Sequence, residues 1–347
     1  MIRFDSHEFR RAGRVPDKLA PIRNVWEKWA ERLPCLYNPG PEVTVGEQLV
    51  LFRGCCPFRQ YIPSKPGKYG IKIRTLCVAK SSYVWNMQVN TRKAASGALE
   101  KNGGVRILLD TTEGLRGRNI TCDSFFTSNE LGQELLKRKM TMVDEVRKNK
   151  PELPTVVLVT KGREVFSSKF AFTPSATLVS YCPKRNRSVV LLSTLHKDTE
   201  VGDGEDRKPA VVMDYNRSKG GVVNLGKASG IYSCKRVTAR WPLVIFYNVI
   251  DVSSHNAVVI WNKLNPTWMA GKRNKKRAFL DQLGRELVTP QIQRRGHLPR
   301  TAAPAALARA VQGGGTWPQC ARGPVCSRFS RGRQTQEVPF LPNEEGL

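Results

Sequence analysis

The sequence lacks a long hydrophobic run, a secretory leader and an ordered set of cysteines. Its most apolar helical segment, residues 241–250, extends for about ten residues before polar residues interrupt it, whereas about 20 are needed to cross a bilayer. Charged residues begin at Arg3, so no signal peptide opens the chain. Nine cysteines, an odd number without framework spacing, indicate mostly reduced thiols. We therefore expect a protein of the cytosol or nucleus with no membrane partner.

Acidic residues are scarce beside basic ones. The chain of 347 residues has 57 Lys and Arg against 29 Asp and Glu, a formal net charge of +28. Such an excess repels itself unless an anionic partner screens it, which points to nucleic acid. The chain is long enough for one large domain or two ordinary ones, and it has no internal repeat. Residues 218–223, SKGGVV, lack the Gly-Lys-Ser/Thr ending of a phosphate-binding loop and are interpreted as the turn before a helix.

The first half of the chain predicts one helix followed by strands. Residues 17–33 place Ile22, Trp26, Trp29 and Leu33 on one helical stripe, which we assign to the core. Strand-like runs follow at 43–52, 68–79, 82–90 and 119–122, separated by Pro and Gly. Thr127 and Glu130 then form a capping box for a second helix. Asp123 therefore lies where a strand gives way to a helix.

The second half is β-rich and then helical. We predict strands at 141–146, 155–160, 169–174, 177–182 and 188–195, a polar loop at 197–208, and a long helix after Arg240 with Pro242 in its first turn. This order suggests an α/β or α+β core with a β-rich insertion. The chain becomes basic from Lys272. Beyond about Ala302 it is rich in Ala, Gly, Pro and Arg, a composition typical of disorder.

Several long segments resemble the piggyBac family of DNA transposases over roughly residues 2–310. They include YNPGPEVTVGEQLVLFRG, RNITCDSFFTSNELGQELLKRK, DRKPAVVMDYNRSKGGVVNLGK and TARWPLVIFYNVIDVSSHNA. The resemblance implies an α/β, ribonuclease-H-like core that cuts and rejoins DNA at TTAA targets using Mg²⁺. It divides the chain into an N-terminal helical remnant (1–40), the first part of the core (41–149), a β-rich insertion (150–208), the second part of the core with a basic C-terminal helix (209–300) and a disordered tail (301–347).

The resemblance also shows which metal-binding acids this chain lacks. The first-strand pattern T-V-D-E-Q-L has Gly46 at the acid position, and G-G-V-D-x-L-D stands here as GGVVNLG, with Val223 and Gly226 in place of two acids. Only Asp123 of T-C-D is kept. We therefore interpret Gly46 as the mark of a lost ligand rather than of a β-bulge. Asp123 is either the surviving ligand or a polar residue ahead of a helix.

No neighbouring acid is expected to substitute. Glu47 should face away from Gly46 because successive strand residues point to opposite sides of a sheet. Asp214, Asp144 and Glu145 fall on other predicted elements. We expect no strand cleavage and no resident cofactor, although active family members use Mg²⁺.

DNA binding is the activity that we expect to survive. The basic cluster Lys272, Arg273, Lys275, Lys276 and Arg277 can bind phosphates, serve as a nuclear-import signal or form a solvated charge run. We add Arg116 and Arg118 to the DNA-binding residues and expect a nuclear protein. A homodimer is compatible with the resemblance, and no small-molecule substrate is expected.

Both ends of the chain bear on function. The N-terminal region of family members is largely absent before Met1, so the chain is expected to be truncated. In the tail, Cys320 and Cys326 are too few for the family's zinc module, and no zinc is expected. The expected function is therefore a catalytically inactive, transposase-derived protein with non-specific DNA binding. The alternatives are an active Mg²⁺-dependent transposase and a decayed product without a selected role.

Overall fold

The computed structural model describes residues 2–4, 17–91 and 103–313. Its contacts divide the chain into two compact units, residues 1–272 and 273–347, and each is described by itself. The predicted residue ranges for core and insertion stay predictions, because contacts alone do not assign them.

The first unit is built on one mixed sheet, which contains nine strands among the described residues. The strand order is β2-β3-β1-β5-β6-β9-β8-β7, and β4 pairs with β3 beside β2. β1 lies antiparallel to β3 and parallel to β5, and β5 lies parallel to β6. The strands are β1 (Glu42–Leu51), β2 (Gln60–Tyr61), β3 (Tyr69–Val78), β4 (Val84–Val89), β5 (Asn119–Thr121), β6 (Thr141–Glu145), β7 (Ser168–Phe172), β8 (Thr177–Lys184) and β9 (Arg187–Ser193).

Alternating side chains of β1 and β3 create two cores, one on each face of the sheet. Val43 and Val45 of β1 pack into one core with Leu76 of β3, whereas Ile71 and Ile73 of β3 belong to the other. This is the period of two that a strand imposes. The predicted strands at 43–52, 68–79 and 82–90 are confirmed.

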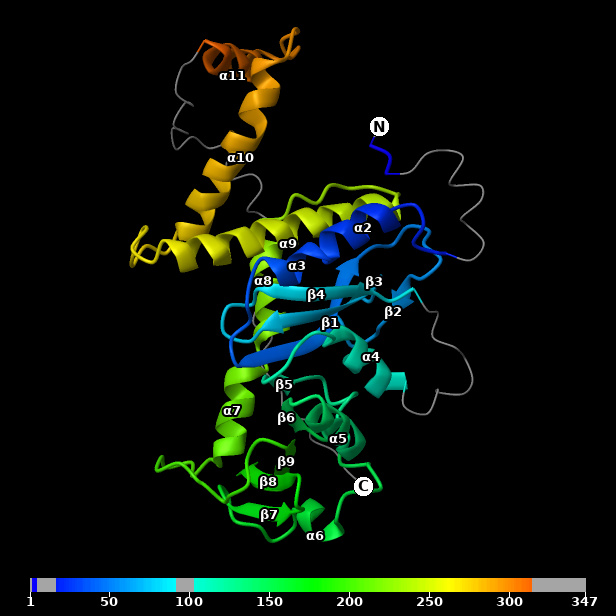
Figure 1. Ribbon diagram of the computed structural model, residues 1–347, viewed down its shortest axis with the longest axis vertical. Coiled ribbons are helices and arrows are strands. Elements are labelled where there is room, and N and C mark those ends of the chain that lie inside the picture. Colours follow the sequence, from blue (N-terminus) through cyan, green and yellow to red (C-terminus); the bar gives the residue numbers. More distant parts are fainter. Residues whose placement is uncertain (1, 5–16, 92–102, 314–347) are drawn as a thin grey trace, which may run out of the picture. The chain divides into compact units, whose positions relative to one another are not determined.

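Helices cover both faces of the sheet (Figure 1). Residues of α4 and α5 line the first core, whereas α2, α8 and α9 line the second, and α7 packs beside β6 and β9. The helices of this unit are α2 (Arg23–Ala30), α3 (Arg32–Cys35), α4 (Gly103–Thr111), α5 (Asn129–Lys137), α6 (Thr155–Leu158), α7 (Ala210–Ser218), α8 (Gly221–Ile231) and α9 (Trp241–Leu264). Trp26 is buried, and Trp29 is half-buried with its indole N–H donating to Ser253.

The helix α9 is longer than the apolar run in the sequence suggested. Its 24 residues are long and apolar enough to cross a membrane by length and composition alone. Asn256 nevertheless hydrogen-bonds both backbone groups of Val84, each at 2.9 Å, and His255 contacts the carbonyl oxygen of Ser82. These contacts cover the outer edge of β4, as a core helix does. The absence of a membrane partner stays a prediction.

Three local predictions are wrong. Residues 155–158 form the short helix α6 instead of a strand, with only Val157 buried. The cap of α5 is Ser128, not Thr127, because the hydroxyl of Ser128 accepts from the backbone N–H of Leu131 at 3.1 Å. Residues 302–312, expected to be disordered, form α11 (Ala302–Gln312). The rest of the predicted tail, 314–347, lies outside the described residues.

The second unit contains α10 (Lys275–Gln293) followed by α11. The side-chain amide of Gln312 donates to the carbonyl oxygens of Ile292 and Arg295, both at 2.9 Å, and so joins the two helix ends. Ala305, Ala308 and Val311 are the buried side chains of α11.

Candidate functional site

Gly46 of β1 and Asp123, which follows β5, come just after the last paired residues of these two parallel strands. The parallel pairing of β1 and β5 matches Thr44 with Thr121, so two residues further along each chain Gly46 lies level with Asp123. The register of β1 with β3 runs through Gly46 opposite Thr75 without interruption. No bulge therefore explains Gly46, which agrees with its interpretation as a replaced residue.

Both positions face the helices α7 and α8. The hydroxyl of Thr44 donates to the carbonyl oxygen of Ser218 at 2.6 Å, and the hydroxyls of Thr121 and Ser218 lie 2.6 Å apart. Residues two apart on a strand share a face. Side chains at 46 and 123 therefore point to the same side as Thr44 and Thr121, and the sequence-based pairing of these positions in one site is geometrically consistent.

The helix α8 contains the other two predicted positions and packs against β1 and β3. A Cβ on Gly46 would meet three side-chain atoms of Val222 at 3.2 to 3.3 Å, so the side chain of Val222 occupies the space beside Gly46. Val223 follows directly and is 60% exposed. Gly226 lies one turn further and has open space around it. Val223 and Gly226 therefore offer no oxygen ligand where the family pattern has acids.

Gly221 explains why α8 can lie so close to β1. A Cβ at this position would lie 2.7 Å from the hydroxyl oxygen of Thr44 and 3.4 Å from the backbone of Ala79. Only a glycine permits this approach. The helix begins at Gly221, and Lys219 and Gly220 form the turn that precedes it, so the turn predicted in this segment is present between α7 and α8.

Asp123 is exposed and holds a local turn. Its carboxylate accepts from the backbone N–H of Phe125 at 3.1 Å, and its carbonyl oxygen accepts from Phe126 at 2.8 Å. This Asx turn connects β5 to α5. Asp123 therefore has a structural role of its own, whether or not it also binds a metal ion.

Sequence reasoning missed Glu145 and Asp144 as neighbours of Asp123. The strand β6 pairs with β5 so that Ile120 faces Met142, which places Glu145 level with Asp123. The carboxylate of Asp144 is fully buried and accepts from the backbone N–H of Cys122 at 2.8 Å. Only the strand register, which one sequence does not give, could have revealed these positions.

The pKa values of two groups at this edge, Asp144 and Tyr215, are raised. Burial raises the pKa of Asp144 to about 7, although hydrogen bonds from Cys122 and Glu145 oppose the shift. Burial and then the carboxylates of Asp144, Glu145 and Asp123 raise the pKa of Tyr215. The Tyr215 hydroxyl donates a hydrogen bond to the carboxylate of Glu145 at 3.4 Å, so Glu145 already has a hydrogen-bond donor from α7.

The residues at this edge do not fit a pair of Mg²⁺ ions. Two hard divalent cations require several converging oxygen ligands. Asp123 and Glu145 supply two carboxylates, and Gly46, Val223 and Gly226 supply none. Across residues 2–4, 17–91 and 103–313, no three His, Cys, Asp or Glu side chains converge in the manner of a metal site.

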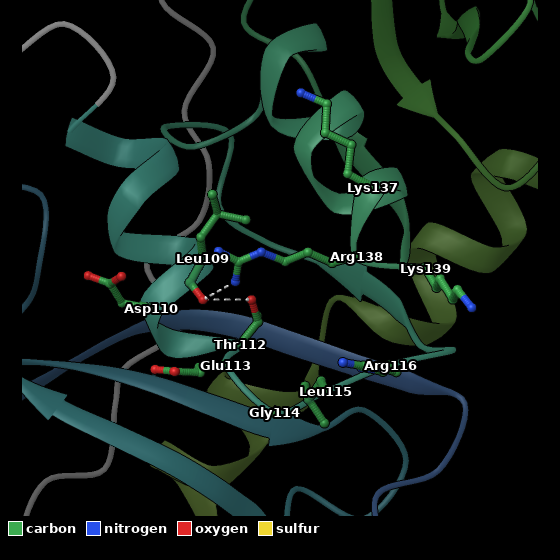
Figure 2. Close-up of a pocket in the computed structure, with 10 residues that line it drawn as sticks. All are labelled: Leu109, Asp110, Thr112, Glu113, Gly114, Leu115, Arg116, Lys137, Arg138 and Lys139. Atoms are coloured by element: carbon green, nitrogen blue, oxygen red, sulfur yellow. Dashed lines mark hydrogen bonds between the residues drawn. The ribbon is translucent and has the colours of Figure 1, made fainter.

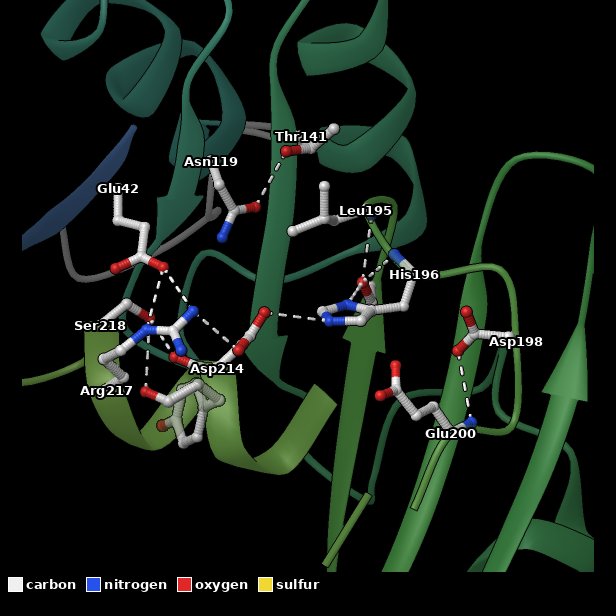
Figure 3. A network of polar contacts seen from close by, with 12 residues as sticks. Glu42, Asn119, Thr141, Leu195, His196, Asp198, Glu200, Asp214, Arg217 and Ser218 are labelled. Carbon is white, nitrogen blue, oxygen red and sulfur yellow. Dashed lines mark hydrogen bonds and ion pairs between the residues drawn. The ribbon is translucent and has the colours of Figure 1, made fainter. Parts of the chain in front are cut away.

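Two other acids are held elsewhere by ion pairs. Glu47 pairs with Lys72 on β3 and, as expected, belongs to the face opposite Gly46. Asp214 lies 3.1 Å from His196 and 2.8 Å from Arg217 (Figure 3). Neither carboxylate replaces a missing ligand at the edge that contains Asp123.

The predicted DNA-binding cations do not gather around Asp123. Arg116 and Arg118 precede β5, whereas Asp123 follows it, so they lie at opposite ends of the strand. Lys272 ends the first unit. The remaining predicted cations begin the second unit, in and before the first turn of α10: Arg273, Lys275, Lys276 and Arg277. Cys320 and Cys326 lie outside the described residues, so the zinc prediction is untested.

The chain is similar to known transposases in sequence and in structure. A family model described as transposase IS4 matches residues 2–258. A solved structure, described as the cryo-EM structure of a piggyBac transposase synaptic complex with hairpin DNA, superimposes with a TM-score of 0.80 at 33% identity. The match covers 92% of this chain and 66% of that one. The expected resemblance and ribonuclease-H-like α/β fold are thereby confirmed: the chain belongs to the transposase IS4 family, with a piggyBac transposase among its structural relatives.

Proposed function

We propose that this chain is a piggyBac-transposase-derived protein that binds DNA but neither cuts nor joins it. The observation that supports the loss of catalysis is the register of β1 and β5. It puts Gly46 beside Asp123, at the position where the family pattern has a second carboxylate. The side chain of Val222 fills the adjacent space.

Phosphodiester cleavage requires more carboxylate ligands than the sheet edge that contains Asp123 provides. Phosphodiester cleavage on two metal ions needs ligands that hold both ions and orient the attacking and leaving oxygens. Removing most of the ligands of a metal site abolishes binding, because the remaining groups cannot compensate for dehydrating the ion. Asp123 and Glu145 leave the site at least two acids short of the family pattern.

DNA binding is supported by charge. The chain carries a net charge of +28. Lys275, Lys276 and Arg277 open α10, whose first turn contains no acid. Cations at a helix N-terminus add to the positive end of the helix dipole, so an anion at this position relieves their repulsion. The solved relative is a complex with hairpin DNA. Binding of this chain to DNA in the nucleus, alone or as a homodimer, belongs to the proposal.

One preparation of the protein tests both halves of the proposal. Nicking and joining of DNA with family-type ends are measured with Mg²⁺ and with Mn²⁺, beside an Asp123→Ala control. We expect no product above that control. Retention of a duplex is measured by fluorescence anisotropy from 50 to 200 mM salt. Five phosphate contacts predict a slope of about −4.5 in log K against log salt. Metal-dependent product or salt-independent binding would refute the proposal.

The alternative of a decayed product has a separate test. A chain without a selected role accumulates damage in its core, and such damage lowers the cooperativity of unfolding. Buried apolar side chains form a continuous cluster on each face of the sheet. We expect a single cooperative urea transition, and a broad transition without a folded baseline would favour decay.

A further inference from the structure

Two basic loops lie together at the sheet edge opposite Asp123. Residues 116–118 precede β5, and residues 137–139 end α5 and precede β6. The backbone N–H of Gly117 donates to the carbonyl oxygen of Lys139 at 2.8 Å, and that of Thr141 donates to Arg118 at 3.0 Å. We call these loops the cationic ridge. It contains five cations within six residues: Arg116, Arg118, Lys137, Arg138 and Lys139.

Only part of this charge is used inside the protein. Lys137 pairs with Glu134 at 2.6 Å, and the guanidinium of Arg138 donates to the carbonyl oxygen of Leu109 at 2.9 Å. Arg118 donates to the side chain of Asn38 at 3.2 Å. Arg116 and Lys139 are exposed, and no described residue pairs with either side chain. The side chains of Arg116 and Lys139 are therefore accessible to an anionic partner.

A pocket lies on each side of the ridge. One, of about 650 Å³, is lined by Arg116, by Lys139, by Asp110 of α4 and by Glu113, which follows that helix (Figure 2). Figure 2 shows these two acids on the side of the pocket away from Arg116 and Lys139. The other pocket, of about 420 Å³, is also lined by Lys139. The ridge thus stands between two hollows and presents its cations outward.

The other pocket adds little free negative charge. Its acids are Glu42 and Asp214. Both contact the guanidinium of Arg217 at 2.8 Å, which compensates one of their two charges. A polyanion that approaches the ridge from this side meets paired acids and the unpaired ammonium of Lys139.

The packing of the loops does not account for so many cations. One or two basic residues at the carboxyl end of α5 complement the helix dipole, but the facing loop contributes two more from outside that helix. Lys139 also adopts a left-handed backbone conformation, with φ of +59°, at a helix end where glycine is usual. A lysine at this position costs backbone energy that a glycine would not.

We propose that the cationic ridge binds the phosphate backbone of duplex DNA at a surface separate from the edge that contains Asp123. Asp123 lies five positions after Arg118, which is about 16 Å at the rise of an extended chain. The two edges therefore present different surfaces to DNA. This inference rests on the proposed DNA binding, and it assigns that binding a second location besides the start of α10.

The test compares two double charge reversals that change the net charge equally. Arg116→Glu with Lys139→Glu alters the ridge. Lys161→Glu with Arg185→Glu alters two exposed cations of the β7–β9 region and serves as the matched control. Binding of a fluorescent duplex is measured by anisotropy at several salt concentrations. Two lost phosphate contacts predict a slope that is shallower by about 1.8 and at least a tenfold loss of affinity at low salt. We expect the control to keep the wild-type slope.

The outcomes separate this inference from the proposed function. Equal losses in both double variants would show that only net charge matters and would overturn the ridge. A wild-type slope in the ridge variant, with loss in Lys275→Glu plus Arg277→Glu, would overturn the ridge and leave the proposed function standing. No wild-type binding would refute both. Tenfold stronger competition by single-stranded RNA of equal length would overturn duplex DNA as the partner. If charge reversal prevents folding, the corresponding Gln variants answer the same question.

Discussion

Rebuilding the missing acids tests the reasoning about Gly46 directly. The substitutions are Gly46→Asp, Val223→Asp and Gly226→Asp, singly and together. A Cβ at position 46 would lie 3.2 to 3.3 Å from Val222, closer than the 3.5 to 4.0 Å at which carbon atoms attract. Val222 is 8% exposed and β-branched, so it cannot move aside freely. We expect Gly46→Asp to lower the free energy of unfolding by about 1 to 3 kcal/mol in EDTA.

The other two substitutions should cost much less. Val223 is 60% exposed, and an added Cβ at Gly226 meets no atom within 4 Å. Changes at such positions usually stay within about 0.5 kcal/mol. In EDTA, we therefore expect the triple variant to have about the same free energy of unfolding as Gly46→Asp. A metal ion at 100 times its Kd would add about 2.7 kcal/mol, which offsets most or all of that cost.

The assay is urea unfolding followed by tryptophan fluorescence, with EDTA or MnCl₂. Gly230→Asp is the matched control, because Gly230 lies on the same helix in open space. We expect Mn²⁺ to raise the urea midpoint of the triple variant only. Stabilisation of the wild-type protein by Mn²⁺ would refute the loss of the metal site. An unchanged midpoint for Gly46→Asp in EDTA would refute the steric argument.

Three further predictions concern stability, each measured by urea unfolding. Because burial raises the pKa of Asp144 from 3.8 to about 7, the native state holds a proton that the unfolded state releases. Stability that is present below pH 3.8 is therefore lost as pH rises to about 7, on the order of 4 kcal/mol, and Asp144→Asn should flatten this profile. Ser128→Ala removes the cap of α5 and should cost about 1 kcal/mol, whereas no change would deny the cap. Asn256→Ala leaves both backbone groups of Val84 unpaired, so we expect a loss of about 2 to 4 kcal/mol, and a loss below 1 would mean that water replaces the amide.

Hydrophobic periodicity predicted the central strands well. β1 and β3 alternate between two buried faces, and their apolar residues repeat accordingly. The prediction of a strand at residues 155–160 was wrong for a physical reason. A run of Thr, Val and Leu this short fits a strand or one helical turn, and Pro154 starts a turn in which Val156 stays 69% exposed. The cap of α5 was assigned to Thr127, one residue before the true cap Ser128, because two hydroxyl residues stand next to each other before the helix.

The site was predictable only in part. The family pattern gave Gly46, Asp123, Val223 and Gly226, and the register brings the first two together. It gave no information on Glu145, because the pairing of β5 with β6 depends on tertiary contacts that one sequence does not encode legibly. The position of Arg116 and Arg118 beside residues 137–139 was hidden for the same reason.

The close approach at Gly221 fixes the position of α8 by packing alone. Any larger residue there would push α8 away from Thr44, whichever groups stand at positions 223 and 226. The placement of α8 therefore does not depend on which side chains stand at those two positions. A helix held in this way can change its exposed residues one at a time while its contact with the sheet stays the same.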